Sequence, residues 1–380
     1  MRCWFLGIVV ACHSHEPPPS AEPPPTPSLP PELEAAWTGE AIEPRVVHTA
    51  PTAFPLGNDL TIATLTAHGW LGTRMKSVEG FIDEIVDEHG VIATGPSASL
   101  VVDGDVVYVV FEPADQPARV TRLDKRKLVP VTGEVGFHWA FGGVGIENDT
   151  RAGLKTQRWQ TVAIDHDKSS VVETSDGPYA TGATRLGNEV IVSTREHDPP
   201  ASNEDKAAAL IAAQNGHTMG LAGLVGQPRG WLLHVDAKGH VASKELFDAQ
   251  TPSHVATTKS GWLVISTEGT AGHMFNDGVL LARAPNDPTL RVIARNIELG
   301  SKLIAAGDWA CMYTMPGDAR VVHCVDPVRR IHVTSEPLTD NIMLYGIELT
   351  PKPRLVLHHT WYREGYGKPA AEDTLEIALP

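Results

Sequence analysis

The sequence has no long hydrophobic run. No stretch reaches the roughly twenty consecutive apolar residues that a membrane-spanning helix needs, so we expect no helix of this kind. Long helical patterns are nearly absent as well, whereas Val, Ile, Thr and Gly are frequent and turn residues recur at short intervals. The composition therefore predicts an all-β protein.

Basic and aromatic residues are both scarce. Lys and Arg together number 31 against 46 Asp and Glu, which gives a formal net charge of −15. Nucleic-acid binding relies on clustered Lys and Arg that neutralise phosphates, so no nucleic-acid partner is predicted. Aromatic residues make up only 6% of the chain, which weakens the case for a sugar-binding surface built on ring stacking.

One small unit recurs along the chain. An apolar run ends in Asp or a similar residue, crosses a tight polar turn and returns as a second β-rich run, as in Ile85-Val86-Asp87 followed by Val91-Ile92. Spacings of roughly forty to fifty residues between such units are typical of repeat proteins. The six hairpins predicted in this way span residues 85–92, 122–129, 163–172, 234–242, 282–292 and 324–333.

A second set of turns lies upstream of these hairpins. The joining turns fall at residues 56–58, 102–104, 142–143, 186–188, 259–261, 306–308 and 350–351. Seven units of about four strands predict a seven-bladed β-propeller. The last unit shows three strands, and we expect residues 45–48 to complete it and close the ring, because closure removes unpaired edges. A double β-sandwich is the alternative fold, but it does not explain the sevenfold recurrence.

The N-terminus carries a targeting signal. Arg2 precedes a short apolar core, and Val9-Val10-Ala11-Cys12 resembles the lipobox of bacterial lipoproteins. This resemblance implies cleavage before Cys12, lipidation of that cysteine and anchoring in the cell envelope. His13 after the cysteine, in place of Asp, resembles lipoproteins that are sorted to the outer membrane. Residues 13–32 form a Pro-rich, extended tether, and residues 33–380 form the predicted propeller.

Two of the four cysteines are predicted to form a disulfide. Cys311 and Cys324 flank a hairpin whose two-residue loop we expect at Gly317-Asp318. Counting outward from that loop places the two cysteines directly opposite one another, within disulfide range. An exported protein sits in an oxidising compartment in which such a bond persists.

Loops of the repeated units are expected to meet at one rim of the ring. Residues 67–70, 147–149, 195–197, 268–273 and 359–364 contain His, carboxylate and aromatic side chains, which are the types used in catalysis and binding. The candidate catalytic residues are Arg195, Glu196, His197, His217, Glu268 and His273. The candidate binding residues are His68, Trp70, His359, Trp361, Tyr362 and Arg363.

Residues 197–230 form an insertion at this rim, with a predicted helix capped by Asn203. His358 and His359 are adjacent in a predicted strand, so they point to opposite faces and only one of them could bind an ion. No spaced ligand motif identifies a metal site, and the sequence identifies no cofactor.

The sequence leaves two functions open. The first is an envelope-anchored binding module that takes a small-molecule or protein partner at this rim. The alternative is a propeller hydrolase or lyase acting on glycans or small esters, with rim histidines and carboxylates and a divalent metal as an option. No short repeat, such as a WD dipeptide at the ends of the units, names a propeller family.

Overall fold

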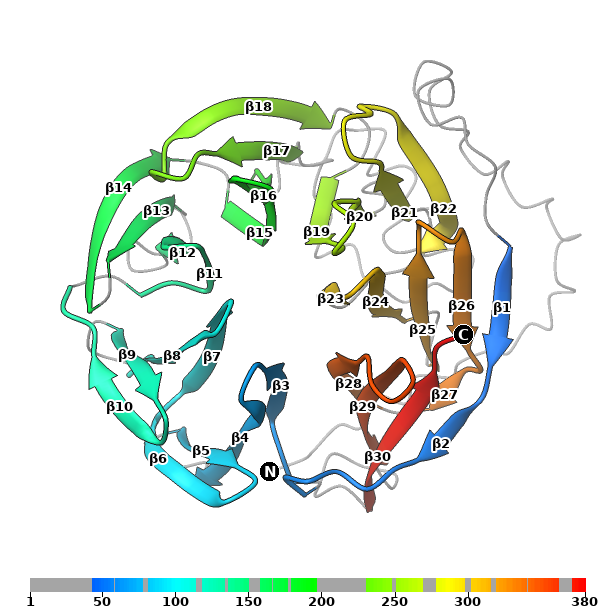
Figure 1. Ribbon diagram of the computed structural model, residues 1–380, viewed down its shortest axis with the longest axis horizontal. Coiled ribbons are helices and arrows are strands. Elements are labelled where there is room, and N and C mark those ends of the chain that lie inside the picture. Colours follow the sequence, from blue (N-terminus) through cyan, green and yellow to red (C-terminus); the bar gives the residue numbers. More distant parts are fainter. Residues whose placement is uncertain are drawn as a thin grey trace, which may run out of the picture.

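The computed structural model describes fifteen stretches of the chain, which form thirty strands and no helix. These stretches are residues 43–57, 59–77, 81–113, 118–133, 136–149, 158–165, 167–176, 179–196, 230–247, 251–268, 278–297, 302–315, 319–339, 341–361 and 371–380. The strands form seven sheets that stand side by side in a ring (Figure 1), and the innermost strand of each sheet lines a central channel. The prediction of an all-β, seven-bladed propeller is therefore confirmed.

The seven sheets are numbered as blades 1 to 7 in chain order. Blade 1 contains β3 (Ile62–Thr66), β4 (Gly69–Ser77), β5 (Ile82–Asp87) and β6 (Gly90–Pro96). Blade 2 contains β7 (Ala98–Asp103), β8 (Val106–Phe111), β9 (Arg119–Asp124) and β10 (Lys127–Pro130). Blade 3 contains β11 (Trp139–Phe141), β12 (Val144–Asp149), β13 (Arg158–Asp165) and β14 (Lys168–Asp176).

Blades 4 to 7 continue the ring. Blade 4 contains β15 (Tyr179–Leu186), β16 (Glu189–Arg195), β17 (Gly230–Val235) and β18 (Val241–Phe247). Blade 5 contains β19 (Thr251–Thr257), β20 (Leu263–Glu268), β21 (Gly278–Arg283) and β22 (Leu290–Ile297). Blade 6 contains β23 (Ile304–Ala306), β24 (Trp309–Thr314), β25 (Ala319–Asp326) and β26 (Ile331–Ser335), with β1 (Pro44–Val47) and β27 (Leu338–Thr339) added. Blade 7 contains β28 (Asn341–Glu348), β29 (Arg354–Trp361), β30 (Ala371–Ala378) and β2 (Thr49–Pro51).

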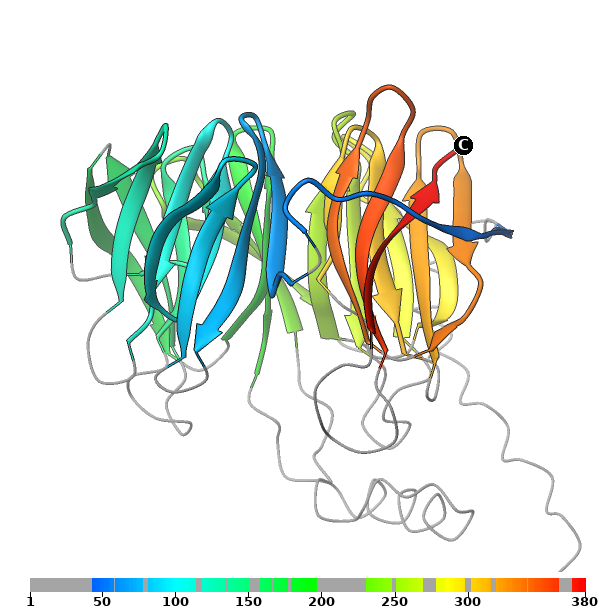
Figure 2. The same cartoon turned by 90° about the horizontal axis from the view of Figure 1, so that it is seen from below.

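Within a blade, the strands are called A to D from the channel outward. They are antiparallel, so the A–B and C–D turns share one end of the ring, which we call the AB face. The B–C connections and the steps to the next blade share the other end, which we call the BC face. The AB face is the upper edge of the ring in Figure 2, where the C-terminus also lies.

Burial explains why the inner strands are so apolar. Each blade packs between two others, so both faces of its middle strands are covered and the usual in–out alternation disappears. In β16 the five central residues are all buried, and β8 reads VVYVVF with five of its six residues buried. The outer strand β18, by contrast, is largely exposed. The core is therefore a series of layers between neighbouring blades rather than one central cluster.

The predicted repeat units agree with the strands, except at the start. All six predicted hairpins are C–D hairpins, and six of the seven predicted joining turns are A–B turns. The turn at residues 56–58 is wrong as an A–B turn, because the segment before it crosses from the outside of blade 7 to the inside of blade 1. Phe54 and Leu56 pack against the cluster of buried side chains around Trp70 and Tyr345. The true A–B turn of blade 1 joins Thr66 to Gly69.

The ring is closed by the N-terminal segment, but by a different strand from the one predicted. β1 pairs in parallel with β26 of blade 6, and the next strand, β2, supplies the outer strand of blade 7 by pairing with β30. The chain changes blades at His48, where the Glu336 carboxylate contacts the His48 ring at 2.9 Å and the Thr49 backbone N–H at 3.5 Å. The expected closure is thus present, with its strand displaced from residues 45–48 to Thr49–Pro51.

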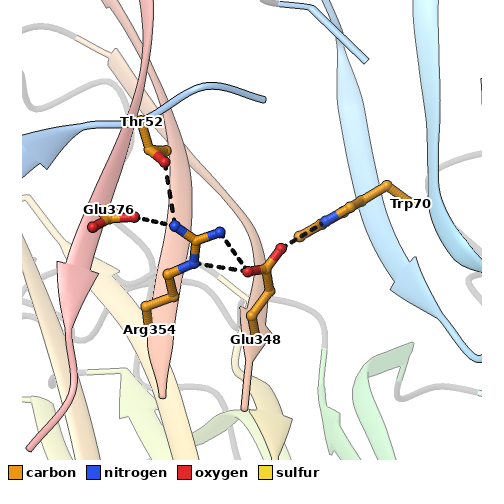
Figure 3. A network of polar contacts seen from close by, with 5 residues as sticks. All are labelled: Thr52, Trp70, Glu348, Arg354 and Glu376. Carbon is orange, nitrogen blue, oxygen red and sulfur yellow. Dashed lines mark hydrogen bonds and ion pairs between the residues drawn. The ribbon is translucent and has the colours of Figure 1, made fainter. Parts of the chain in front are cut away.

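A network of polar contacts stabilises this closure of the ring (Figure 3). The Arg354 guanidinium contacts the Glu348 carboxylate at 2.6 and 2.7 Å, the Glu376 carboxylate, and the Thr52 hydroxyl at 3.3 Å. The Trp70 indole N–H, from blade 1, donates to Glu348 at 2.9 Å. The Arg354 guanidinium, on β29, therefore links β28 and β30 of the same blade to the N-terminal segment, and Glu348 extends the link to blade 1.

The predicted disulfide is confirmed. Cys311 and Cys324 are register partners on β24 and β25, their Cα atoms lie 4.1 Å apart, and their side chains are bonded. Both cysteines are fully buried in the layer between blades 6 and 7. The predicted loop at Gly317-Asp318 lies outside the described residues.

Candidate functional site

The central channel is lined by the A strands of all seven blades. It encloses about 470 Å³, and its walls include residues of β3, β7, β11, β15, β19, β23 and β28. Each A strand is hydrogen-bonded on one side only, to its B strand. The other edge turns its backbone N–H and C=O groups toward the channel, where they need water or a ligand as partners. The channel is therefore a cavity whose walls present backbone polar groups, and its size suits a small molecule.

The described residues of the channel wall include three side chains of basic type, His138, Arg185 and Lys302. They include no Asp or Glu. This contrasts with the formal net charge of −15 for the whole chain. The walls of the channel therefore differ in electrostatic character from the protein that surrounds them.

His138 stands at the BC end of the channel, directly before β11. Its Nε2 lies 3.6 Å from the carboxylate of Glu112, which directly follows β8 of blade 2. Burial lowers the pKa of His138, and the positive charge of Lys302 lowers it further, while Glu112 acts in the opposite direction. The imidazole therefore interacts electrostatically with one carboxylate, that of Glu112, and with one amine, that of Lys302.

Lys302 lies at the same end of the channel, two residues before β23. Its side chain is exposed, yet the protein atoms near it desolvate the ammonium group and lower its pKa. His138 belongs to blade 3 and Lys302 to blade 6, which stand across the ring from one another (Figure 1). The two groups therefore face the BC end of the channel from opposite walls.

The AB face uses its polar groups to join blades. The Asp103 carboxylate, in blade 2, accepts hydrogen bonds from the backbone N–H groups of Gly142 and Gly143 in blade 3, at 2.6 and 3.0 Å. Both glycines have positive φ, 60° and 85°, which a residue with a side chain rarely adopts. Asp308 of blade 6 accepts from the Ser260 N–H of blade 5 in a similar way, at 2.8 Å. These contacts give the AB face a structural role.

Several residues singled out from the sequence do lie at the BC face. Arg195, Glu268 and Trp361 are the last residues of B strands, and Glu196 directly follows Arg195. The Arg195 guanidinium lies over the Tyr179 ring at 5.6 Å, a cation–π contact between two strands of blade 4. These residues belong to different blades and share one rim, as the repeat pattern predicted.

His358 and His359 point to opposite faces of β29. The His358 ring stacks on Tyr345 and contacts the Thr360 hydroxyl at 2.9 Å. The buried His359 contacts the backbone carbonyl of Thr339 at 2.6 Å. The expectation that the two histidines cannot share one ion is consistent with these contacts.

The grouping of residues 67–70 with this rim is wrong. They form the A–B turn of blade 1, so His68 and Trp70 lie on the AB side of the ring. Trp70 is also buried, with its ring edge-on to Phe54 and its N–H on Glu348. The error follows from the misplaced first turn, which shifted the whole of blade 1 by one strand.

Other predicted features lie outside the described residues. They are Cys12, His197, His217, His273, Tyr362 and Arg363, together with all but the last residue of the insertion at 197–230. Their roles stay predictions from the sequence.

Sequence reasoning missed Glu112, His138 and Lys302. None of them lies in a motif, and each is a single polar residue beside an apolar strand. Their position in the repeat could have identified two of them, because a residue just before an A strand lies at the BC end of the channel wall. His138 and Lys302 occupy such positions before β11 and β23.

In the described part of the chain, no group of three or more His, Cys, Asp or Glu side chains has an arrangement that could hold a metal ion. Within the same residues, no helix is long and apolar enough to cross a membrane.

No model of a known protein family matches this chain, and no curated protein matches it either. Solved structures do resemble it. The β-propeller domain of the Trilobed protease from Pyrococcus furiosus aligns with a TM-score of 0.46 and 7% identity, over 79% of this chain and 91% of that one. The Dos1 propeller aligns with a TM-score of 0.47 and 9% identity, over 83% and 82% of the two chains.

Pyrococcus horikoshii acylaminoacyl peptidase aligns with a TM-score of 0.47 and 10% identity, over 85% of this chain but only 52% of that one. At such low identities, these likenesses concern the fold alone.

Proposed function

We propose that this protein is a binding module that takes a small-molecule ligand at the BC end of its central channel. The observation that carries the proposal is the channel itself, a cavity of about 470 Å³ with His138 and Lys302 on opposite walls at one end. Concave sites with a few convergent polar groups are the usual form of ligand sites in proteins. The arrangement of the AB face supports the choice of end, because its turn carboxylates Asp103 and Asp308 already bond neighbouring blades.

A steric plug tests this proposal. Ala305 is an exposed residue of β23 on the channel wall, so Ala305→Trp places an indole ring inside the cavity without removing a core side chain. The unfolding temperature of the full chain is measured with and without the fraction below ~1 kDa of an extract of the producing cells. A ligand that binds only the folded state raises this temperature by mass action. We expect a rise for the unmodified chain and none for Ala305→Trp.

The matched control for this test is Ala242→Trp, on the exposed outer strand β18 of blade 4. This variant should respond to the extract as the unmodified chain does. An equal rise in Ala305→Trp, or no rise in any of the three proteins, would exclude the channel as the ligand site. The enzyme alternative has its own test. If the protein is a hydrolase or lyase, alanine at Glu196, His197, His217 or His273 should abolish activity, whereas partner binding should stay mostly intact in these variants if a broader surface is used.

The second part of the proposal concerns location. A lipid on Cys12 and the Pro-rich residues 13–32 would hold the propeller at the surface of a membrane of the cell envelope. At about 3.1 Å per residue, an extended tether of this length spans some tens of Å. The outer membrane is the expected site because His13 follows the cysteine.

Labelled palmitate should be incorporated into the chain when it is produced in a lipoprotein-processing bacterium. Cys12→Ser should abolish the labelling, because the lipid is attached through this thiol. Cys3→Ser is the matched control and should keep it, because Cys3 belongs to the segment that is cleaved off. Labelling that survives in Cys12→Ser would refute the anchor.

A further inference from the structure

We infer that the group bound at the BC end of the channel is an oxyanion, a carboxylate or a phosphate, held between Lys302 and His138. This inference rests on the proposed function and specifies the chemical class of the ligand. It starts from the walls of the channel, whose described residues include three side chains of basic type and no carboxylate.

The position of the two groups favours one small anion between them. His138 and Lys302 come from blades that stand across the ring, yet both line the same cavity at its BC end. Burial lowers the pKa of His138, so at neutral pH its ring offers an anion a hydrogen-bond donor, while Lys302 supplies the positive charge. The low-dielectric walls strengthen this attraction relative to open water.

Glu112 affects how much His138 and Lys302 each contribute to binding of the anion. Its carboxylate lies 3.6 Å from Nε2 of His138 and competes with any bound anion for the imidazole. Lys302 should therefore contribute more to binding than His138. Arg185 stands on β15 beside the A–B turn, toward the other end of the channel, and its Nε donates to the Gly187 carbonyl at 3.0 Å. We assign it no contact with an anion at the BC end.

Inorganic phosphate and citrate are suitable probes, because they present the two kinds of oxyanion. Isothermal titration of the full chain at low ionic strength and neutral pH should show binding of at least one of them. Lys302→Gln should weaken it by about tenfold or more, because it removes a charge-assisted hydrogen bond. Lys302→Arg should restore most of the affinity. His138→Gln should have the smaller effect.

The matched control is Lys244→Gln, which removes the same charge from the exposed face of β18. It should change the affinity by less than twofold. A second measurement needs no variant: the rate of reductive methylation of the Lys302 amine. Phosphate or citrate should slow this reaction, whereas chloride at equal ionic strength should leave its rate unchanged. This second readout keeps the test valid if Lys302→Gln fails to fold.

Two outcomes would overturn the inference. One is that neither probe binds or protects Lys302, and the other is that Lys302→Gln and Lys244→Gln weaken binding equally. If this happens while Ala305→Trp still blocks the response to the cell extract, the ligand is not an oxyanion but the channel remains its site. If Ala305→Trp has no effect on that response, the proposed function itself fails.

Discussion

A chain that begins at Ala53 is expected to lose about 3 to 5 kcal/mol of unfolding free energy relative to a chain that begins at Glu43. The shorter chain lacks β1 and β2, and with them the outer strand of blade 7 and the added strand of blade 6. A hydrogen bond between strands contributes about 1 kcal/mol net, and β2 pairs with β30 at three positions and through the Thr52 N–H. Loss of the Arg354–Thr52 contact adds to this effect.

Urea unfolding followed by tryptophan fluorescence measures the difference, with both chains compared in the same buffer. The shorter chain also leaves β30 as an unpaired edge, which is a template for pairing with another copy. We therefore expect it to associate at concentrations at which the longer chain remains monodisperse in size-exclusion chromatography. Equal urea midpoints for the two chains would show that the closure strand contributes nothing, and that the ring is held by packing between blades alone.

This prediction also marks the limit of what the sequence alone reveals. Hairpins are local, so the turn residues after Asp87 or Asp236 and the β-rich runs on either side are enough to identify them. The pairing of Cys311 with Cys324 is local too, because it follows from counting along one hairpin. Fold class, blade number and disulfide were predictable for this reason.

Contacts between distant segments leave no such signal. Trp70 looks like a ligand-stacking residue in the sequence, whereas it donates to Glu348, which lies 278 positions away. The closure strand was misplaced because Val46-Val47 has the stronger β-propensity, while the less β-rich Thr49–Pro51 is the segment that reaches blade 7. His138 and Lys302 were missed because only the closed ring brings blades 3 and 6 to face each other.

Acidification is expected to destabilise the fold through a pair of histidines in blade 6, the buried His332 and the partly buried His323. The rings of His323 and His332 stack at 5.4 Å, with Nδ1 of His323 3.2 Å from Nε2 of His332, and Nε2 of His323 lies 3.1 Å from the Thr314 hydroxyl. Both side chains project from the side of the sheet that packs on blade 5, because His323 alternates with the buried Cys324 that faces blade 7. Burial, with a further contribution from His332, lowers the pKa of His323 to about 3.

The sign of the effect follows from proton uptake. Between pH 6.5 and 3 the unfolded chain binds a proton on His323 that the folded chain does not, so stability falls as the pH falls. The loss from this one group amounts to about 2 kcal/mol at pH 5 and about 4 kcal/mol at pH 3. Because net stabilities are commonly about 5 to 15 kcal/mol, this is a large share of the total.

Urea unfolding at pH 7 and pH 5 compares the unmodified chain with His323→Gln, which keeps a polar side chain but cannot be protonated in this range. The variant should be less stable at pH 7, because the contact with His332 is altered, but it should lose about 2 kcal/mol less between the two pH values. His89→Gln, at an exposed turn of blade 1, is the matched control and should keep the full pH dependence. If His323→Gln and His89→Gln show the same pH dependence, the acid sensitivity of the protein has its source elsewhere in the chain.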